Sequence, residues 1–226
     1  MADLENTLYL DIADAKGESK GRVTIELRPD LAPNHVARIK ELAREGAYDG
    51  VVFHRVIEGF MAQGGDVENG NTNSPNFNPG RAGMGGSKKP NLKQEFSAEP
   101  HLRGVCSMAR SQNPDSANSQ FFIVFDDATF LDRQYTVWGK VTSGMEIVDG
   151  IKRGEPVSNP DKIAKMQVAK DAAWVLGCAP WPGLSRPSLS ACGAILNRHH
   201  RACPGDPCQG QARCPGNDGW PEQVRP

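Results

Sequence analysis

Alternating apolar and polar residues at the start of the chain predict two β-strands. In residues 6–12 every second residue is aliphatic, and the same alternation returns in residues 22–27. This two-residue period is typical of half-buried strands, because successive side chains of a strand point to opposite faces. A polar stretch with Lys16, Gly17 and Glu18 separates the two runs, so a hairpin is expected.

Helical spacing appears in two places. In residues 30–46, Val36, Ile39 and Leu42 fall on one face of a helix, and Pro33 suits a first turn. Residues 145–151 repeat this spacing over a shorter length. The pattern therefore predicts two helices, one amphipathic and one brief.

Short apolar segments separated by polar turns fill much of the remaining chain. Strands are predicted at 104–109, 121–125, 136–141 and 165–170. Many short strands with only two helices favour a mainly β fold, a closed antiparallel barrel, since closure removes exposed strand edges. Residues 68–90 are rich in Gly, Asn and Pro and predict a long loop. This loop is either a surface excursion or part of a substrate groove.

Residues 53–66 combine a β-rich run, a glycine break and a second apolar run. Residues two apart in a strand share a face. Two faces are predicted in this way, one carrying Phe53, Arg55 and Ile57 and the other carrying Met61 and Gln63. The segment thus places a cation and an amide beside apolar side chains, without a nucleophile or an acid/base pair.

Composition narrows the class of protein. The chain has 226 residues, of which 38% are apolar, and a formal net charge of −1. Such a charge gives no basic footprint for nucleic acid. The acidic N-terminus lacks the features of a signal peptide, and no window resembles a membrane span. These features indicate a soluble, cytoplasmic protein with no nucleic-acid or membrane partner.

Cysteine usage divides the chain. Only Cys106 lies in residues 1–173, whereas residues 174–226 hold the other five cysteines and eight of the 17 prolines. The first part therefore uses cysteine as intracellular proteins do. We predict one domain at 1–173 and an irregular, disordered Pro/Cys-rich tail at 174–226.

Two other interpretations of the tail stay open. Zinc accepts the ligand types at His199, His200, Cys203, Cys208 and Cys214, but their spacing matches no close pair of the C-x2-C kind. A frameshift would explain the absence of Lys together with the excess of Cys, Pro, Trp and Arg. No metal site is assigned.

Ordered motifs carry a family resemblance over about residues 5–173. They are Phe-His-Arg-Val-Ile at 53–57, Gly-Phe-Met at 59–61, Gln-Gly-Gly-Asp at 63–66, Ser-Met-Ala-Arg at 107–110, Ser-Gln-Phe-Phe-Ile at 119–123, Phe-Leu-Asp at 130–132 and Val-Trp-Gly-Lys-Val at 137–141. The chain resembles cyclophilin-type peptidyl-prolyl cis/trans isomerases of bacterial type. This resemblance implies an eight-stranded barrel with a helix over each end, and a monomer that acts on proline-containing polypeptides without a cofactor.

The resemblance also implies roles for individual residues. Arg55 would stabilise the twisted amide, and Gln63 would orient the arginine or the peptide carbonyl. The proline pocket would be formed by Phe60, Met61, Phe122 and Leu131, and the groove would be lined by Ala109, Gln120 and Tyr135. Three positions depart from the eukaryotic pattern: Arg110 replaces an asparagine, Phe130 a tryptophan, and Tyr135 stands near a histidine position. Because the tryptophan helps to bind cyclosporin in the family, we expect only weak inhibition.

The same residues also allow functions other than isomerisation. A non-catalytic proline-peptide binding module or holdase chaperone would use the same pocket. A hydrolase is disfavoured, because His54 is predicted to face away from Arg55 and Ser107 lies in no nucleophile turn. His35 and His101 are expected to be surface or capping residues.

Overall fold

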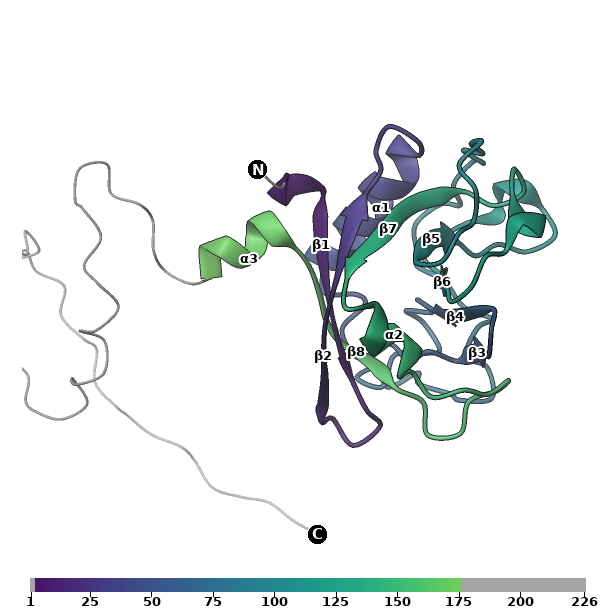
Figure 1. Ribbon diagram of the computed structural model, residues 1–226. Coiled ribbons are helices and arrows are strands. Elements are labelled where there is room, and N and C mark those ends of the chain that lie inside the picture. The colour runs from purple at the N-terminus through teal and green to yellow at the C-terminus, as the bar shows by residue number, and fades with distance from the viewer. Residues whose placement is uncertain (1–2, 176–226) are drawn as a thin grey trace, which may run out of the picture. The chain divides into compact units, whose positions relative to one another are not determined.

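The computed structural model of the protein describes residues 3–175, and its framework is a curled sheet of eight antiparallel strands (Figure 1). The strands are β1 (Thr7–Ala13), β2 (Ser19–Leu27), β3 (Arg55–Ile57), β4 (Met61–Gly64), β5 (Val105–Met108), β6 (Phe121–Val124), β7 (Val137–Ser143) and β8 (Lys162–Val168). The predicted hairpin is confirmed, because Leu8 pairs with Ile25 and Leu10 with Val23, and all four side chains are buried. None of the helices in residues 3–175 is both long and apolar enough to span a membrane.

The sheet has two ends, so the predicted closed barrel is not confirmed. The strand order is β3-β4-β6-β5-β7-β2-β1-β8. In the described residues the two ends of the sheet meet through isolated bridges: Val52, before β3, pairs with Lys162 of β8, and Val56 of β3 pairs with Gly154. The chain before β3 turns at Gly50, whose φ is +91°, and lies beside β8, with Gly50 N donating to Ile163 O at 2.8 Å and Ile163 N to Val51 O at 2.8 Å. The mainly β fold with eight antiparallel strands stands.

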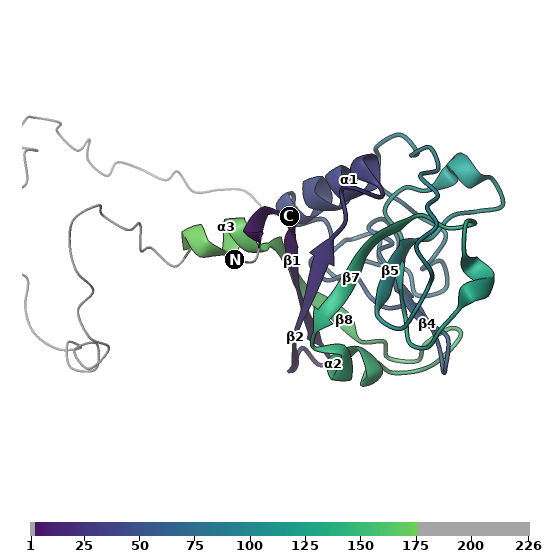
Figure 2. The same cartoon turned by 45° about the horizontal axis from the view of Figure 1, so that its top comes forward.

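Three α-helices accompany the sheet in the described residues, instead of the two that were predicted. They are α1 (Pro33–Arg44), α2 (Met145–Asp149) and α3 (Ala169–Val175), and short 3-10 helices lie at Leu4–Asn6, Pro114–Ser116 and Thr129–Leu131. Helices α1 and α2 lie near opposite ends of the curled sheet (Figures 1 and 2).

Helix α3 ends the predicted strand 165–170 early and runs through the predicted boundary at residue 173. Two ion pairs tie it to the domain: Lys170 Nζ lies 3.4 Å from Glu5 Oε2, and Arg44 Nε lies 2.8 Å from Asp171 Oδ2. These partners are remote in sequence, which is why periodicity alone missed the helix. The five tail cysteines and the two tail histidines lie outside the described residues, so the domain division stays a prediction.

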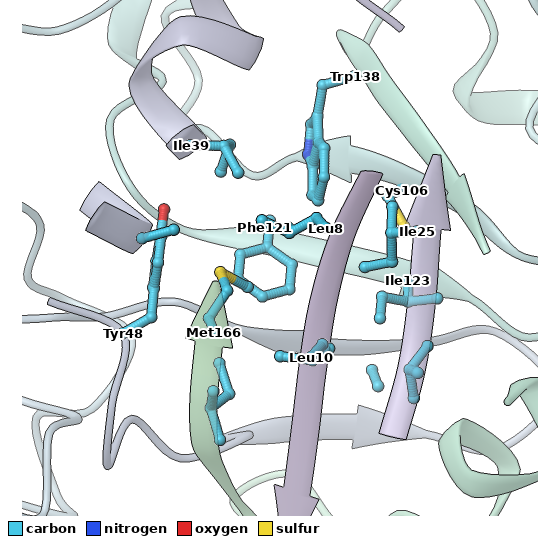
Figure 3. Close-up of a cluster of buried hydrophobic side chains, with 14 of the residues drawn as sticks. Leu8, Leu10, Ile25, Ile39, Tyr48, Cys106, Phe121, Ile123, Trp138 and Met166 are labelled. Atoms are coloured by element: carbon cyan, nitrogen blue, oxygen red, sulfur yellow. The ribbon is translucent and has the colours of Figure 1, made fainter. Parts of the chain in front are cut away.

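The core is built around Phe121 of β6. Its ring meets Tyr48 and Trp138 edge to face, with centroids 5.7 Å apart in each pair (Figure 3). Burial raises the pKa of the Tyr48 hydroxyl, which remains protonated and donates to Ser119 O at 2.9 Å. A fully buried hydroxyl with a partner avoids the desolvation penalty that an unpaired one would incur.

The predicted common face of Phe53, Arg55 and Ile57 is wrong for Phe53. The Phe53 side chain is fully buried in the main core, whereas the Arg55 side chain is 40% exposed. The reason is that β3 begins only at Arg55, while the Phe53 amide donates to Asp161 O at 2.9 Å. The two-residue period therefore does not extend back to Phe53.

Candidate active site

A pocket of about 410 Å³ opens beside β3 and β4. Eight of the nine predicted site residues line it: Arg55, Phe60, Met61, Gln63, Ala109, Phe122, Leu131 and Tyr135. The ninth, Gln120, lines an adjoining pocket. The long loop contributes Ala82, Gly83 and Met84, so of the two interpretations of that loop the structure favours a lining segment.

The apolar part of this pocket is a cluster separate from the main core. Met61, Phe122 and Leu131 are each at most 8% exposed, and Phe60 and Tyr135 pack against them. The rings of Phe122 and Tyr135 meet edge to face, with centroids 5.6 Å apart. Strands β4 and β6 present Met61 and Phe122 on one face because Gln63 pairs with Phe122 and Met61 with Val124, and Leu131 comes from the 3-10 helix Thr129–Leu131. The result is an apolar cup of a size suited to a small ring.

Arg55 is the cation at the edge of the cup. It is the first residue of β3 and lies directly opposite Gln63 of β4. Its Nε donates to Glu155 Oε1 at 2.5 Å. In the described part of the chain, neither Nη atom has a hydrogen-bond partner, so the terminal N–H groups are available to a ligand in the pocket.

The side-chain amides form a chain that supports the long loop. Gln63 Nε2 donates to Gln120 Oε1 at 3.1 Å, and Gln120 Nε2 donates to Gly83 O at 2.9 Å and to Gly85 O at 2.7 Å. The Gln63 side chain thus bonds Gln120, and no side-chain hydrogen bond joins it to Arg55 within residues 3–175. Gln120, the residue before β6, therefore links the sheet to the long loop.

The Asp66 carboxylate also holds this loop in place. Its side chain is fully buried, and it accepts four backbone N–H bonds. Glu68 and Asn69 donate to Oδ1 at 3.1 and 2.9 Å, and Gly83 and Gly85 donate to Oδ2 at 2.7 and 2.9 Å. One carboxylate therefore joins the two ends of the segment that lines the pocket.

His54 lines the pocket beside Arg55, so the prediction that it faces away is wrong. It precedes β3 and escapes the strand alternation. A side chain at Gly83 would collide with its ring, because a Cβ there would lie 2.8 Å from His54 Cδ2. Burial lowers the pKa of His54, and the Asp66 charge only partly opposes this.

Arg110 and Tyr135, two positions that depart from the eukaryotic pattern, form a stacked pair. The Arg110 guanidinium carbon lies 4.6 Å from the centre of the Tyr135 ring. Arg110 Nε and Nη2 also donate to Gln134 O at 3.1 and 3.0 Å. Such a cation–π contact holds the tyrosine against the cup.

His101 is buried, which corrects the prediction of a surface or capping role. Its Nε2 lies 2.9 Å from Ser107 Oγ and its Nδ1 lies 2.9 Å from Asp132 Oδ1. This order matches a Ser-His-Asp triad, but Ser107 is fully buried and lines neither pocket at the site. The hydroxyl cannot reach a substrate, so the chain of bonds is structural: through His101 it ties Asp132, the residue after Leu131, to Ser107 of β5, and the His101 ring stacks on Phe122 with centroids 6.4 Å apart.

His35 is buried too, again contrary to expectation. Its Nδ1 lies 2.6 Å from Glu95 Oε2, and the same carboxylate accepts the His35 amide at the start of α1. Burial lowers the pKa of His35 despite Glu95. Burial raises the pKa of Glu95, but the hydrogen bonds from His35 and Asn34 together outweigh it and lower that pKa. A neutral His35 ring that donates its Nδ1–H to the ionised Glu95 carboxylate is consistent with both lowered pKa values.

The lowered pKa values of His35 and His54 predict that the stability of the folded protein falls in mild acid. Because the pKa values of His35 and His54 are lowered in the folded protein, the unfolded chain takes up protons first below about pH 6.5. The free energy of unfolding is then highest above pH 7, and below about pH 6.5 it falls by at most about 1.4 kcal/mol per histidine for each unit that the pH decreases. Urea titrations at pH 7.5 and 5.5 measure this. An equal loss in a His35→Gln, His54→Gln variant would contradict the assignment.

Comparison with known proteins places this geometry in a family. Residues 9–169 match the family model described as "Cyclophilin type peptidyl-prolyl cis-trans isomerase/CLD". A "Probable peptidyl-prolyl cis-trans isomerase" of Brucella suis biovar 1 (strain 1330) is 59% identical over 175 residues, which cover 75% of this chain and 86% of that protein. The "Peptidyl-prolyl cis-trans isomerase B" of Bacillus subtilis (strain 168) is 38% identical over 140 residues, 61% of this chain and 88% of its own.

The fold agrees with these sequence matches. The crystal structure of the cyclophilin AquaCyp293 from Hirschia baltica superposes with a TM-score of 0.62 at 29% identity, covering 79% of this chain and 77% of that one. Family model, relatives and fold point the same way, and the chain therefore belongs to the cyclophilin-type peptidyl-prolyl cis-trans isomerases.

Proposed function

We propose that the protein interconverts cis and trans X-Pro bonds in polypeptides and so assists their folding, with Arg55 as the electrostatic catalyst. One observation supports this above the others. Among residues 3–175, a guanidinium whose Nη atoms have no partner stands at the edge of an apolar cup, and the described pocket lining includes no Ser, Thr, Cys, Lys, Asp or Glu.

The reaction needs little else. Amide resonance sets a rotation barrier of about 18–20 kcal/mol, and uncatalysed X-Pro exchange takes tens to hundreds of seconds. Exchange within milliseconds requires a rotation barrier that is lower by roughly 5.5–7 kcal/mol. No bond breaks along the way, so the protein has to hold the ring and stabilise a twisted amide.

The pocket residues divide this work. The cup of Met61, Phe122 and Leu131 holds the proline ring, so that the rest of the peptide rotates about it. As the amide twists, its nitrogen becomes pyramidal and charge shifts. The fixed N–H donors of the Arg55 guanidinium stabilise that state.

The test is the cis-to-trans rate of a proline tetrapeptide with the full chain and with a variant ending at residue 175. We expect equal acceleration by both, because the described residues that form the pocket all precede the tail. Peptide binding without acceleration would favour the non-catalytic binding module. Acceleration by the full chain alone would make the domain division wrong.

A further inference from the structure

An acidic side chain from a distant part of the chain lies against Arg55. Glu155 follows α2 by six residues, 100 positions after Arg55 in sequence, yet its Oε1 accepts the Arg55 Nε–H bond at 2.5 Å. No sequence motif pointed to Glu155, and it lines neither of the two pockets at the site.

Backbone hydrogen bonds fix Glu155 in place. Val56 N donates to Gly154 O and Gly154 N donates to Val56 O, both at 2.8 Å. On the other side, Val157 N donates to His54 O at 3.3 Å. Residues 154–157 therefore run alongside the chain from His54 to Val56, and the contact with Arg55 follows from this pairing instead of a chance meeting of two mobile side chains.

Gly154 makes this pairing depend on glycine. Its φ is +154°, and a Cβ there would lie 2.9 Å from Pro156 O and 2.9 Å from Val157 Cα. Val157 is itself 9% exposed and belongs to the main core. The segment that carries Glu155 is thus anchored at both ends.

The bond to Glu155 is made by Arg55 Nε and not by the two Nη atoms at the end of the guanidinium. Only Nε donates to the carboxylate, and the two Nη atoms have no partner among the described residues. Because a guanidinium is planar and rigid, a bond at Nε restricts where both Nη atoms can point. Gln63, the residue predicted to orient the arginine, donates to Gln120 instead.

The pair is too exposed to matter much for folding. The Arg55 and Glu155 side chains are 40% and 54% exposed, and ion pairs of this kind add little to stability. Its effect should therefore appear in how well the donors are aimed, since misplacement of a catalytic group is costly to rate.

We propose that Glu155 is a positioning residue that orients the Arg55 guanidinium for catalysis; this rests on the proposed function. Arg55 touches the substrate amide, and Glu155 acts only through Arg55. The carboxylate restricts the long arginine side chain before substrate arrives, so that the Nη donors meet the twisted amide without first being ordered.

Kinetics of single variants test this. Glu155→Ala should lower kcat about tenfold with KM unchanged, because the apolar cup still binds proline. Glu155→Gln keeps an acceptor without the charge and should lose only about threefold. The matched control is Glu58→Ala: Glu58 Oε2 accepts a bond from Arg153 Nε at 2.6 Å in another partly exposed ion pair, and its loss should leave both constants unchanged.

A double-mutant cycle separates this role from a structural one. In an Arg55→Ala background, Glu155→Ala should cause no further loss of rate. A full additional loss there, an unchanged kcat in Glu155→Ala, or a raised kcat would each overturn the proposal. If the wild-type chain gave no acceleration, the proposed function itself would fail and this proposal with it, which is a distinguishable result.

Discussion

Arg55→Ala is expected to lower kcat/KM for a proline tetrapeptide by about 10²–10³, which is the scale for losing one fixed transition-state donor. The side chain is 40% exposed and its one described hydrogen bond is to Glu155, so the fold should remain intact. The apolar cup is untouched, and peptide affinity should change little.

The measurement is a protease-free isomerisation assay together with a urea unfolding curve. Arg22→Ala is the matched control, because Arg22 is likewise a strand arginine paired with one carboxylate, that of Asp11 at 2.7 Å, but lies on the hairpin of β1 and β2. Turnover near the wild-type value in Arg55→Ala would remove Arg55 from the mechanism.

Asp66→Ala is expected to lower the free energy of unfolding by about 4 kcal/mol and to abolish most activity. The carboxylate is fully buried and accepts four backbone N–H bonds, two of them from Gly83 and Gly85 beside the pocket. Removing an acceptor strands buried donors, and bonds to charged groups are worth more than neutral ones. The loop then loses the link that holds it against Gln120.

Urea unfolding measures the stability and the tetrapeptide assay the activity. Asp14→Ala is the control, since Asp14 also accepts two backbone N–H bonds, from Lys16 and Glu18, but in an exposed hairpin turn. Its loss should lower the free energy of unfolding far less than the loss of Asp66 and should leave the activity unchanged. An equally small effect at Asp66 would mean that the loop is held by other contacts.

Local patterns in the sequence predicted the elements that neighbouring residues determine. Alternation placed β1 and β2 and their hairpin, and helical spacing placed α1 and α2. The family resemblance, carried by motifs that lie far apart in the chain, named nine site residues, and eight of them line the pocket. Periods of two and 3.6 residues are properties of the strand and helix themselves, so they can be read without the fold.

Pairings between remote residues were decided only by the tertiary structure. Examples are the contact of Arg55 with Glu155, the contact of buried His101 with Asp132, and the single bridges in place of a closed ladder. His54 and Phe53 were misplaced because the strand starts at Arg55, a boundary set by pairing with β4. Sequence alone determined which chemical groups the protein carries and the local shape of most segments. Packing between segments decided which groups are buried, which are paired, and how Arg55 is aimed, because those outcomes depend on side chains brought together from opposite ends of the chain.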